Sequence, residues 1–150
     1  KGIIDRSFRH AIGNRVFGCD DCLAICPWNK FASRAKEQKL AAKAGTDLPP
    51  LADLLNLDDA GFRQFFAGTP VRRAGYERFL RNVLIAAGNS GDAGLMPLVM
   101  PFLDHSSALL RAMAVWTLRQ LTNDDIWQGL RDSYLPDERN ESVRHEWQDN

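Results

Sequence analysis

Hydrophobic residues in the last two thirds of the chain recur three and four positions apart, which is the spacing of one buried helix face. One stretch shows this most clearly, with apolar side chains at Phe79, Leu80, Val83, Leu84 and Ala87. The same spacing recurs over residues 58–66, 92–102, 107–118 and 122–135. No segment there alternates polar and apolar residues with a period of two, so the pattern predicts an all-α fold.

Capping residues predict where several helices begin and end. Near the start of the chain, residues 5–12 predict a short helix that stops at Gly13-Asn14. Thr69 precedes Pro70 as an N-cap followed by proline, and Gly88-Asn89 predicts the end of the helix that begins at Gly75.

The helices also resemble one another, which suggests an internal repeat. Residues 79–83 (FLRNV) match 109–113 (LLRAM) at an offset of 30, and the apolar-Arg step returns at 143–144. Helical pairs repeated at this period indicate a HEAT-like α-solenoid. A chance recurrence of the apolar-Arg step is the alternative. We expect the recurring Arg81, Arg111 and Arg144 to bridge to carbonyls or carboxylates of the preceding repeat.

Three regions follow from this pattern. Residues 1–31 form a compact, motif-like segment that holds all three cysteines in the spacing C-x2-C-x3-C-P, so we expect a partial ferredoxin-like, cluster-binding unit. Residues 32–50 are polar, rich in Ala and Lys, and close with Pro49-Pro50, which predicts a linker. Residues 51–150 form the predicted helical repeat domain.

Composition narrows the functional classes. The chain has 150 residues, 45% of them hydrophobic and 25% charged, so it is long enough to bury a core and is neither a disordered nor a fibrous protein. Its longest apolar run, 95–103, holds two prolines and is too short to cross a membrane. Net charge is zero, yet residues 1–45 hold nine basic and four acidic side chains, and the remainder holds ten and fifteen. We expect the chain, which begins at Lys1, to be a piece of a longer protein.

Three cysteines carry the strongest chemical signal. Cys19, Cys22 and Cys26 are spaced C-x2-C-x3-C-P, which is most of the bacterial ferredoxin pattern for iron-sulfur clusters. The position of the first cysteine of the full pattern is occupied by Val16. Cys19 and Cys22 therefore suit one cluster and Cys26 a second, and the other thiolates must come from outside these residues.

Other uses of these cysteines remain open. A zinc site could add His10 to the three thiolates, Cys19 and Cys22 could form a redox dithiol, or all three could simply be buried. An odd, tight group of cysteines suits a reducing compartment, so we expect a cytoplasmic protein.

The sequence resembles the tRNA epoxyqueuosine reductases. The resemblance lies in residues 12–31 (IGNRVFGCDDCLAICPWNKF), which are similar to the family's second cluster motif, and in 73–89 (RAGYERFLRNVLIAAGN), which is similar to the start of its HEAT-like tail. It covers residues 9–31 and 70–121 well and the rest loosely.

This resemblance implies a cobalamin-dependent oxidoreductase with two 4Fe-4S clusters, which converts epoxyqueuosine to queuosine at the tRNA wobble position. Cys19 and Cys22 would ligate the cluster nearer the cobalamin, and Cys26 the outer one. The cobalamin-binding domain, the first ferredoxin motif and the catalytic acid would lie outside this chain, so the piece alone is expected to be inactive. The implied partners are the tRNA anticodon stem-loop and an electron donor, and we expect a monomer with no membrane contact.

Basic and aromatic side chains near these motifs suit a tRNA stem-loop, which offers phosphates and unpaired bases. The candidate tRNA-binding residues are Arg9, Arg15, Lys30, Arg72, Arg73, Tyr76 and Arg78. Two alternatives of other classes stay open: a stand-alone HEAT-like protein-interaction module with a structural metal site, and another two-cluster electron-transfer protein.

Overall fold

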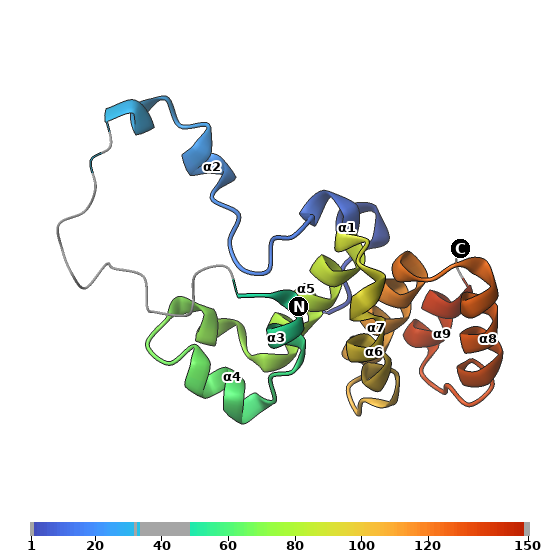
Figure 1. Ribbon diagram of the computed structural model, residues 1–150. Coiled ribbons are helices and arrows are strands. Elements are labelled where there is room, and N and C mark those ends of the chain that lie inside the picture. Colours follow the sequence, from blue (N-terminus) through green and yellow to red (C-terminus); the bar gives the residue numbers. More distant parts are fainter. Residues whose placement is uncertain (1, 32, 34–48, 149–150) are drawn as a thin grey trace.

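A computed structural model describes residues 2–31, 33 and 49–148 of the chain (Figure 1). These residues form α-helices and short 3-10 helices (η) and no strand, so the all-α prediction is confirmed. The predicted linker, 32–50, lies almost entirely outside the described residues. The elements are α1 (Arg6–Ile12), α2 (Asp21–Ala24), η1 (Pro27–Phe31), α3 (Leu51–Leu55), α4 (Asp59–Phe65), η3 (Pro70–Ala74), α5 (Tyr76–Ser90), η4 (Ala93–Leu95), α6 (Met96–Val99), η5 (Met100–Asp104), α7 (Ala108–Leu121), α8 (Asp124–Tyr134) and α9 (Glu141–Gln148).

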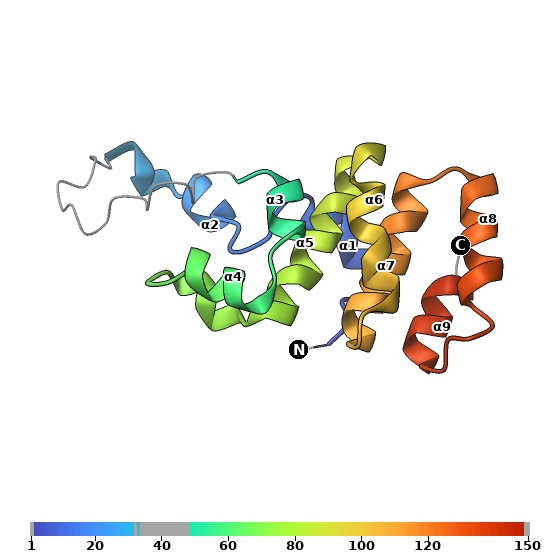
Figure 2. The ribbon, with the colours of Figure 1, turned by 60° about the horizontal axis from the view of Figure 1, so that its bottom comes forward.

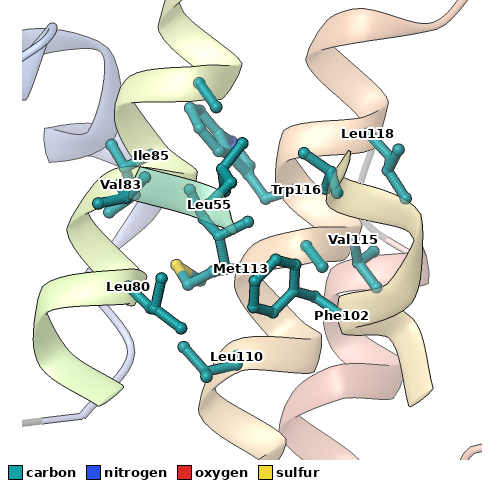
Figure 3. Packing of buried hydrophobic residues seen from close by; sticks show 14 of the residues in the cluster. Leu55, Leu80, Val83, Ile85, Phe102, Leu110, Met113, Val115, Trp116 and Leu118 are labelled. Atoms are coloured by element: carbon teal, nitrogen blue, oxygen red, sulfur yellow. The ribbon is translucent and has the colours of Figure 1, made fainter. Parts of the chain in front are cut away.

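The centre of the molecule is the pair α5 and α7. These two helices pack along each other, and their facing side chains, among them Leu80, Met113 and Leu110, are fully buried (Figure 3). The predicted apolar face over 79–87 is therefore the core face of α5. Burying such residues supplies the main favourable free energy of folding.

The helices continue outward from α7 in layers. α9 packs against α7, and α8 lies beside α9 at the far end of the molecule (Figure 2). There the Trp127 and Trp147 rings stack with their centroids 4.9 Å apart, and both side chains are buried. No helix in the described part of the chain is long and apolar enough to cross a membrane.

The end of α5 differs from the sequence prediction. Gly88-Asn89 does not stop the helix, which runs on to Ser90 and ends at Gly91, where φ is +66°. Gly88 instead lets α7 approach closely, because a Cβ on Gly88 would lie 2.6 Å from Cζ3 of Trp116. Helix packing, and not a turn, therefore requires glycine at position 88.

Prolines begin new helical segments at two places, the first of which was predicted as a helix start. Thr69-Pro70 opens the short 3-10 helix η3, and Gly75, with φ at +80°, separates it from α5. The stretch 92–104 is divided into η4, α6 and η5, with Pro97 and Pro101 at the first or second positions of the latter two. A proline has no backbone N–H, so it opens a new helical segment more readily than it continues one.

The recurring arginines are structural, as expected, although their partners vary. The guanidinium of Arg144 donates to the carbonyls of Leu135 and Glu138. Arg111 donates to the His105 and Ser106 carbonyls and pairs with the Glu138 carboxylate at 2.8 Å. The acidic partner of Arg111 therefore follows it in the sequence, where a preceding one was expected. Arg81 donates to the carbonyl of Gly2 at 2.9 Å.

Helix α1 begins and ends as the sequence predicts. The Asp5 side chain caps it by accepting a hydrogen bond from the Ser7 amide, and hydrogen bonds from Ser7 also lower the Asp5 pKa. Gly13, with φ at +60°, ends it. α1 packs on α5, so the first half of the 1–31 segment lies against the helical part of the molecule.

Candidate metal site and nucleic-acid surface

The three cysteines lie on a short irregular stretch that follows α1. Gly18 and Asp20 flank Cys19, and both have positive φ, at +68° and +51°. A positive φ is costly only for a residue with a side chain, so the local strain beside the first cysteine falls on Asp20 and not on Gly18. Cys22 lies within α2, and Cys26 follows that helix directly before η1. We call residues 14–31 the cysteine segment.

The cysteine thiols are accessible. Cys19 and Cys22 are exposed and Cys26 is partly exposed, so the alternative in which all three cysteines are buried is wrong. Among residues 2–31, 33 and 49–148, no three His, Cys, Asp or Glu side chains gather closely enough to hold a metal ion. His10 lies on α1, where its Nδ1 is 3.1 Å from Oδ1 of Asn89, so the structure does not bring it to the three thiols as a fourth zinc ligand.

The donor chemistry suits an iron-sulfur cluster, but the donor set is partial. Thiolates are the ligands such clusters use, and each 4Fe-4S cluster needs four of them. This chain offers three, on a surface that lets further ligands approach. The residues therefore fit as part of a shared ligand set and not as a complete site.

Apolar side chains that neighbour the cysteines in the sequence are also uncovered. Ile25 is 83% exposed, Trp28 74% and Phe31 69%, and Figure 1 shows α2 and the blue segment beyond it standing apart from α3–α9. The Trp28 and Phe31 rings lie tilted against each other, with centroids 5.9 Å apart. Uncovered apolar side chains in such a group mark a surface that binds another surface.

Two asparagines of α5 hold the backbone that leads to Cys19. Nδ2 of Asn89 donates to the carbonyls of Arg9 and Gly13 at 2.8 and 2.9 Å, and Nδ2 of Asn82 donates to the carbonyl of Val16 at 2.7 Å. Neither asparagine was predicted from the sequence to bind this backbone. Their positions seven residues apart on one helix face were the available signal, but only the docked α1 shows what they bind.

Arg9 is not on the nucleic-acid surface, so its assignment as a tRNA-binding residue is wrong. Its side chain is 1% exposed, and its Nη2 pairs with Oε1 of Glu146 at 2.5 Å. Its Nε donates to the carbonyl of Ile4, and its guanidinium lies 5.5 Å from the centre of the Trp116 ring. A buried arginine held by these partners does not reach the surface where a phosphate would bind.

Tyr76 is also used inside the fold. Its hydroxyl donates to the carbonyl of Leu57 at 2.7 Å, and its ring lies against Phe62 with the centroids 6.0 Å apart. Burial, together with the charges of Asp58 and Asp59, raises the pKa of this hydroxyl. The structure thus gives Tyr76 a packing role and does not support the stacking role expected for it.

The other basic candidates lie at the surface. Arg72 and Arg73 are exposed on η3 and Arg78 is half-buried, and none of the three side chains makes a hydrogen bond or ion pair with the part of the chain that the structure describes. Arg15 pairs with Asp21 at 3.0 Å, and Lys30 lies over the Phe31 ring.

A groove of about 560 Å³ joins Arg78 and Arg81 to the cysteine segment. It runs between α1 and α5, and its lining includes Cys19, Arg15, Arg78 and Arg81. Burial and the neighbouring charge of Arg78 lower the pKa of Arg81, as expected for two cations held close together. The basic residues and the first cysteine thus share one surface.

No protein-family model matches the chain. Epoxyqueuosine reductase of Xanthomonas campestris is 42% identical over 120 residues, which cover 79% of this chain and 34% of that protein. Epoxyqueuosine reductase of Pseudomonas aeruginosa is 39% identical over 127 residues, which cover 80% of this chain and 34% of that protein. The chain therefore spans about a third of the length of the curated relatives it matches.

Solved structures agree with this relationship. The fold is similar to that of epoxyqueuosine reductase from Streptococcus thermophilus, with a TM-score of 0.82 and 26% identity over 98% of this chain and 39% of that one. It is also similar to a crystal structure of epoxyqueuosine reductase with an epoxyqueuosine-modified tRNA stem loop, with a TM-score of 0.89 and 24% identity, again over 98% of this chain and 39% of that one.

Proposed function

From the homology of this chain to the epoxyqueuosine reductases, over about a third of their length, we propose that it is the C-terminal part of such an enzyme. In this proposal, residues 1–31 supply cluster ligands, 32–50 are the linker, and 51–150 form a HEAT-like repeat domain. The observation that carries the proposal is the set of accessible cysteines, Cys19, Cys22 and Cys26, on a segment whose apolar side chains are also uncovered.

The cysteines are proposed to complete two 4Fe-4S clusters together with thiolates from the rest of the enzyme. Cys19 and Cys22 would bind one cluster and Cys26 the other, as the spacing suggests. The apolar side chains beside them would then be covered by the same neighbouring domain, which would exclude water from the clusters. Water exclusion and hydrogen bonding at the sulfurs are what tune cluster potentials.

The reaction is proposed to be the two-electron reduction of epoxyqueuosine in tRNA, with two protons, to queuosine and water. Cobalamin, bound outside this chain, would supply the reducing chemistry at the epoxide. The residues of this chain would hold the clusters that carry electrons from an external donor, and would bind the tRNA.

The surface proposed for the tRNA stem-loop combines the groove beside Cys19 with the exposed arginines of η3. Within the described residues, Arg72, Arg73 and Arg78 have no acidic partner that would compete with phosphate, and Arg15 and Lys30 lie on the cysteine segment. Salt-dependent contacts to phosphates supply most of the affinity of such surfaces.

The test uses the complete natural polypeptide that contains this chain, purified without oxygen and supplied with cobalamin and a chemical reductant. We expect conversion of epoxyqueuosine to queuosine in tRNA, and loss of that conversion in the Cys22→Ser variant. Asp20→Asn is a matched control, since that side chain caps nothing and asparagine tolerates the same left-handed backbone. A complete polypeptide that binds iron but leaves epoxyqueuosine intact would favour another two-cluster electron-transfer protein, and one that binds no iron would favour a helical interaction module.

A further inference from the structure

Helix α1 is bound to the far end of the chain by a buried ion pair. Arg9 is 1% exposed and Glu146, in α9, is 5% exposed. The two Nη atoms of Arg9 lie 2.9 and 2.5 Å from the two carboxylate oxygens of Glu146, which is the bidentate arrangement of a strong pair. The partners are 137 residues apart in the sequence.

The Glu146 carboxylate also pairs with a second arginine of α1. Nη2 of Arg6 lies 2.8 Å from Oε2 of Glu146 and also donates to the Glu146 backbone carbonyl at 2.8 Å. Arg6 and Arg9 are three positions apart, so they extend from one face of α1. A single carboxylate therefore fixes two consecutive turns of the helix that precedes the cysteines.

The chain between α1 and Cys19 is short and is itself fastened. Only residues 13–18 separate the two, and the carbonyls of Gly13 and Val16 accept hydrogen bonds from Asn89 and Asn82. The direction in which the cysteine segment leaves the molecule is therefore set by where α1 lies on α5.

We propose that Glu146 is a positioning residue for the cysteine segment: by pairing with Arg6 and Arg9 it holds α1, and through α1 it holds Cys19 and Cys22 in place. The consequence for cluster binding rests on the proposed function. No cysteine touches Glu146, so its action passes through α1 alone. The acidic C-terminal region thereby acts on the cysteines at the opposite end of the sequence.

Glu138 provides a matched control. Its carboxylate also pairs with an arginine, Arg111, at 2.8 Å and 3.1 Å, and it lies just before the same helix α9. The Glu138 carboxylate accepts hydrogen bonds from Arg111 and from the Asn140 amide, neither of which belongs to α1 or to the cysteine segment. Removing its charge tests the loss of an ion pair without loss of the α1 contact.

The first measurement is amide hydrogen exchange in this 150-residue chain. Glu146→Gln leaves Arg9 buried without its counter-charge, so we expect exchange in residues 6–18 to rise about a hundredfold, with little change in α5 and α7. Glu138→Gln should leave residues 6–18 at the wild-type rate. Equal rates for these residues in Glu146→Gln and Glu138→Gln would overturn the proposal. If Glu146→Gln does not fold, Glu146→Asp, which keeps the charge but shortens its reach, gives the same comparison.

The second measurement is the electron paramagnetic resonance spectrum and midpoint potential of the clusters in the complete polypeptide. A role in stability alone would lower cluster content without moving the potential, whereas altered positioning of Cys19 and Cys22 moves it. We expect a shift in Glu146→Gln and none in Glu138→Gln, and an unshifted potential in both would contradict the positioning role. A wild-type polypeptide without clusters would refute the proposed function, while the exchange rates would still decide whether Glu146 holds the segment.

Discussion

The α5 and α7 pair and the cysteine segment differ in how far their apolar side chains are buried. Leu80, Val83 and Leu110 on the helix pair are fully buried, whereas Ile25 and Trp28 on the cysteine segment are 83% and 74% exposed. The helices have a shared core, whereas the segment has little packing and carries the proposed chemistry. Under the proposed function, the cysteine segment would be completed by another surface, while the helices already bury their apolar faces against one another.

The largest expected effect separates the two regions by stability. Leu84 is fully buried, so Leu84→Ala removes packing and leaves a cavity, at a cost of about 2–5 kcal/mol. The matched change Ile25→Ala should alter the free energy of unfolding of this chain by less than about 0.5 kcal/mol, because its side chain is exposed. Urea unfolding of both variants measures the contrast. Similar losses in the two would show that the segment is packed and would break the comparison.

Close approach of the two central helices gives the next effect. A Cβ at position 88 would lie 2.6 Å from Trp116 Cζ3, so Gly88→Ala should cost about 1–3 kcal/mol through overpacking. Gly129 on α8 has no neighbour within 4 Å of its Cβ direction, so Gly129→Ala should instead be neutral or slightly stabilising. Thermal unfolding distinguishes the two. A stable Gly88→Ala would mean that the helices can move apart freely.

The Arg111 and Glu138 pair predicts a pH dependence confined to the helical part. Hydrogen bonds from Arg111 lower the pKa of the Glu138 carboxyl in the fold. Its contribution is therefore present above the ordinary glutamate pKa, about 4.3, and is lost as the pH falls through the lower value in the fold. At pH 7 the wild type should exceed Glu138→Gln by about 1 kcal/mol in free energy of unfolding, and this gap should close at strongly acidic pH. A gap independent of pH would contradict the pairing.

The smallest effect on stability is expected for the exposed arginines of η3 that are proposed to bind tRNA. Arg72→Ala with Arg73→Ala should leave unfolding unchanged, since both side chains are exposed. In the complete polypeptide it should weaken tRNA binding and reduce the slope of log affinity against log salt by about 2. Arg139→Ala, also exposed but at the far end near α9, is the control. An unchanged slope would remove η3 from the proposed tRNA surface.

Local signals in the sequence are what made much of the fold predictable. α1 begins after Asp5 and ends before Gly13, as expected. The 3.6-residue spacing over 79–87 marks the buried face of α5. These predictions rest on neighbours within a turn or two. The end of α5 was misplaced because Gly88 serves a contact with α7, 28 positions away, and a glycine looks the same in either role.

The candidate site was predictable in its chemistry and not in its surroundings. The spacing of Cys19, Cys22 and Cys26 carries the metal hypothesis without a structure. The burial of Arg9 does not follow from the sequence, because its partner Glu146 lies 137 residues away in a region whose acidic composition suggests solvent exposure. Exposure of single side chains, as at Arg72, likewise depends on which helices meet.

The most direct test of the central claim is the iron content and electron paramagnetic resonance of the complete polypeptide purified without oxygen. The account predicts iron for two 4Fe-4S clusters, loss of one cluster's signal in Cys19→Ser with Cys22→Ser, and loss of the other in Cys26→Ser. Iron content and spectra that are the same in the wild type and in all of these variants would contradict it, since the three thiols would then hold no cluster.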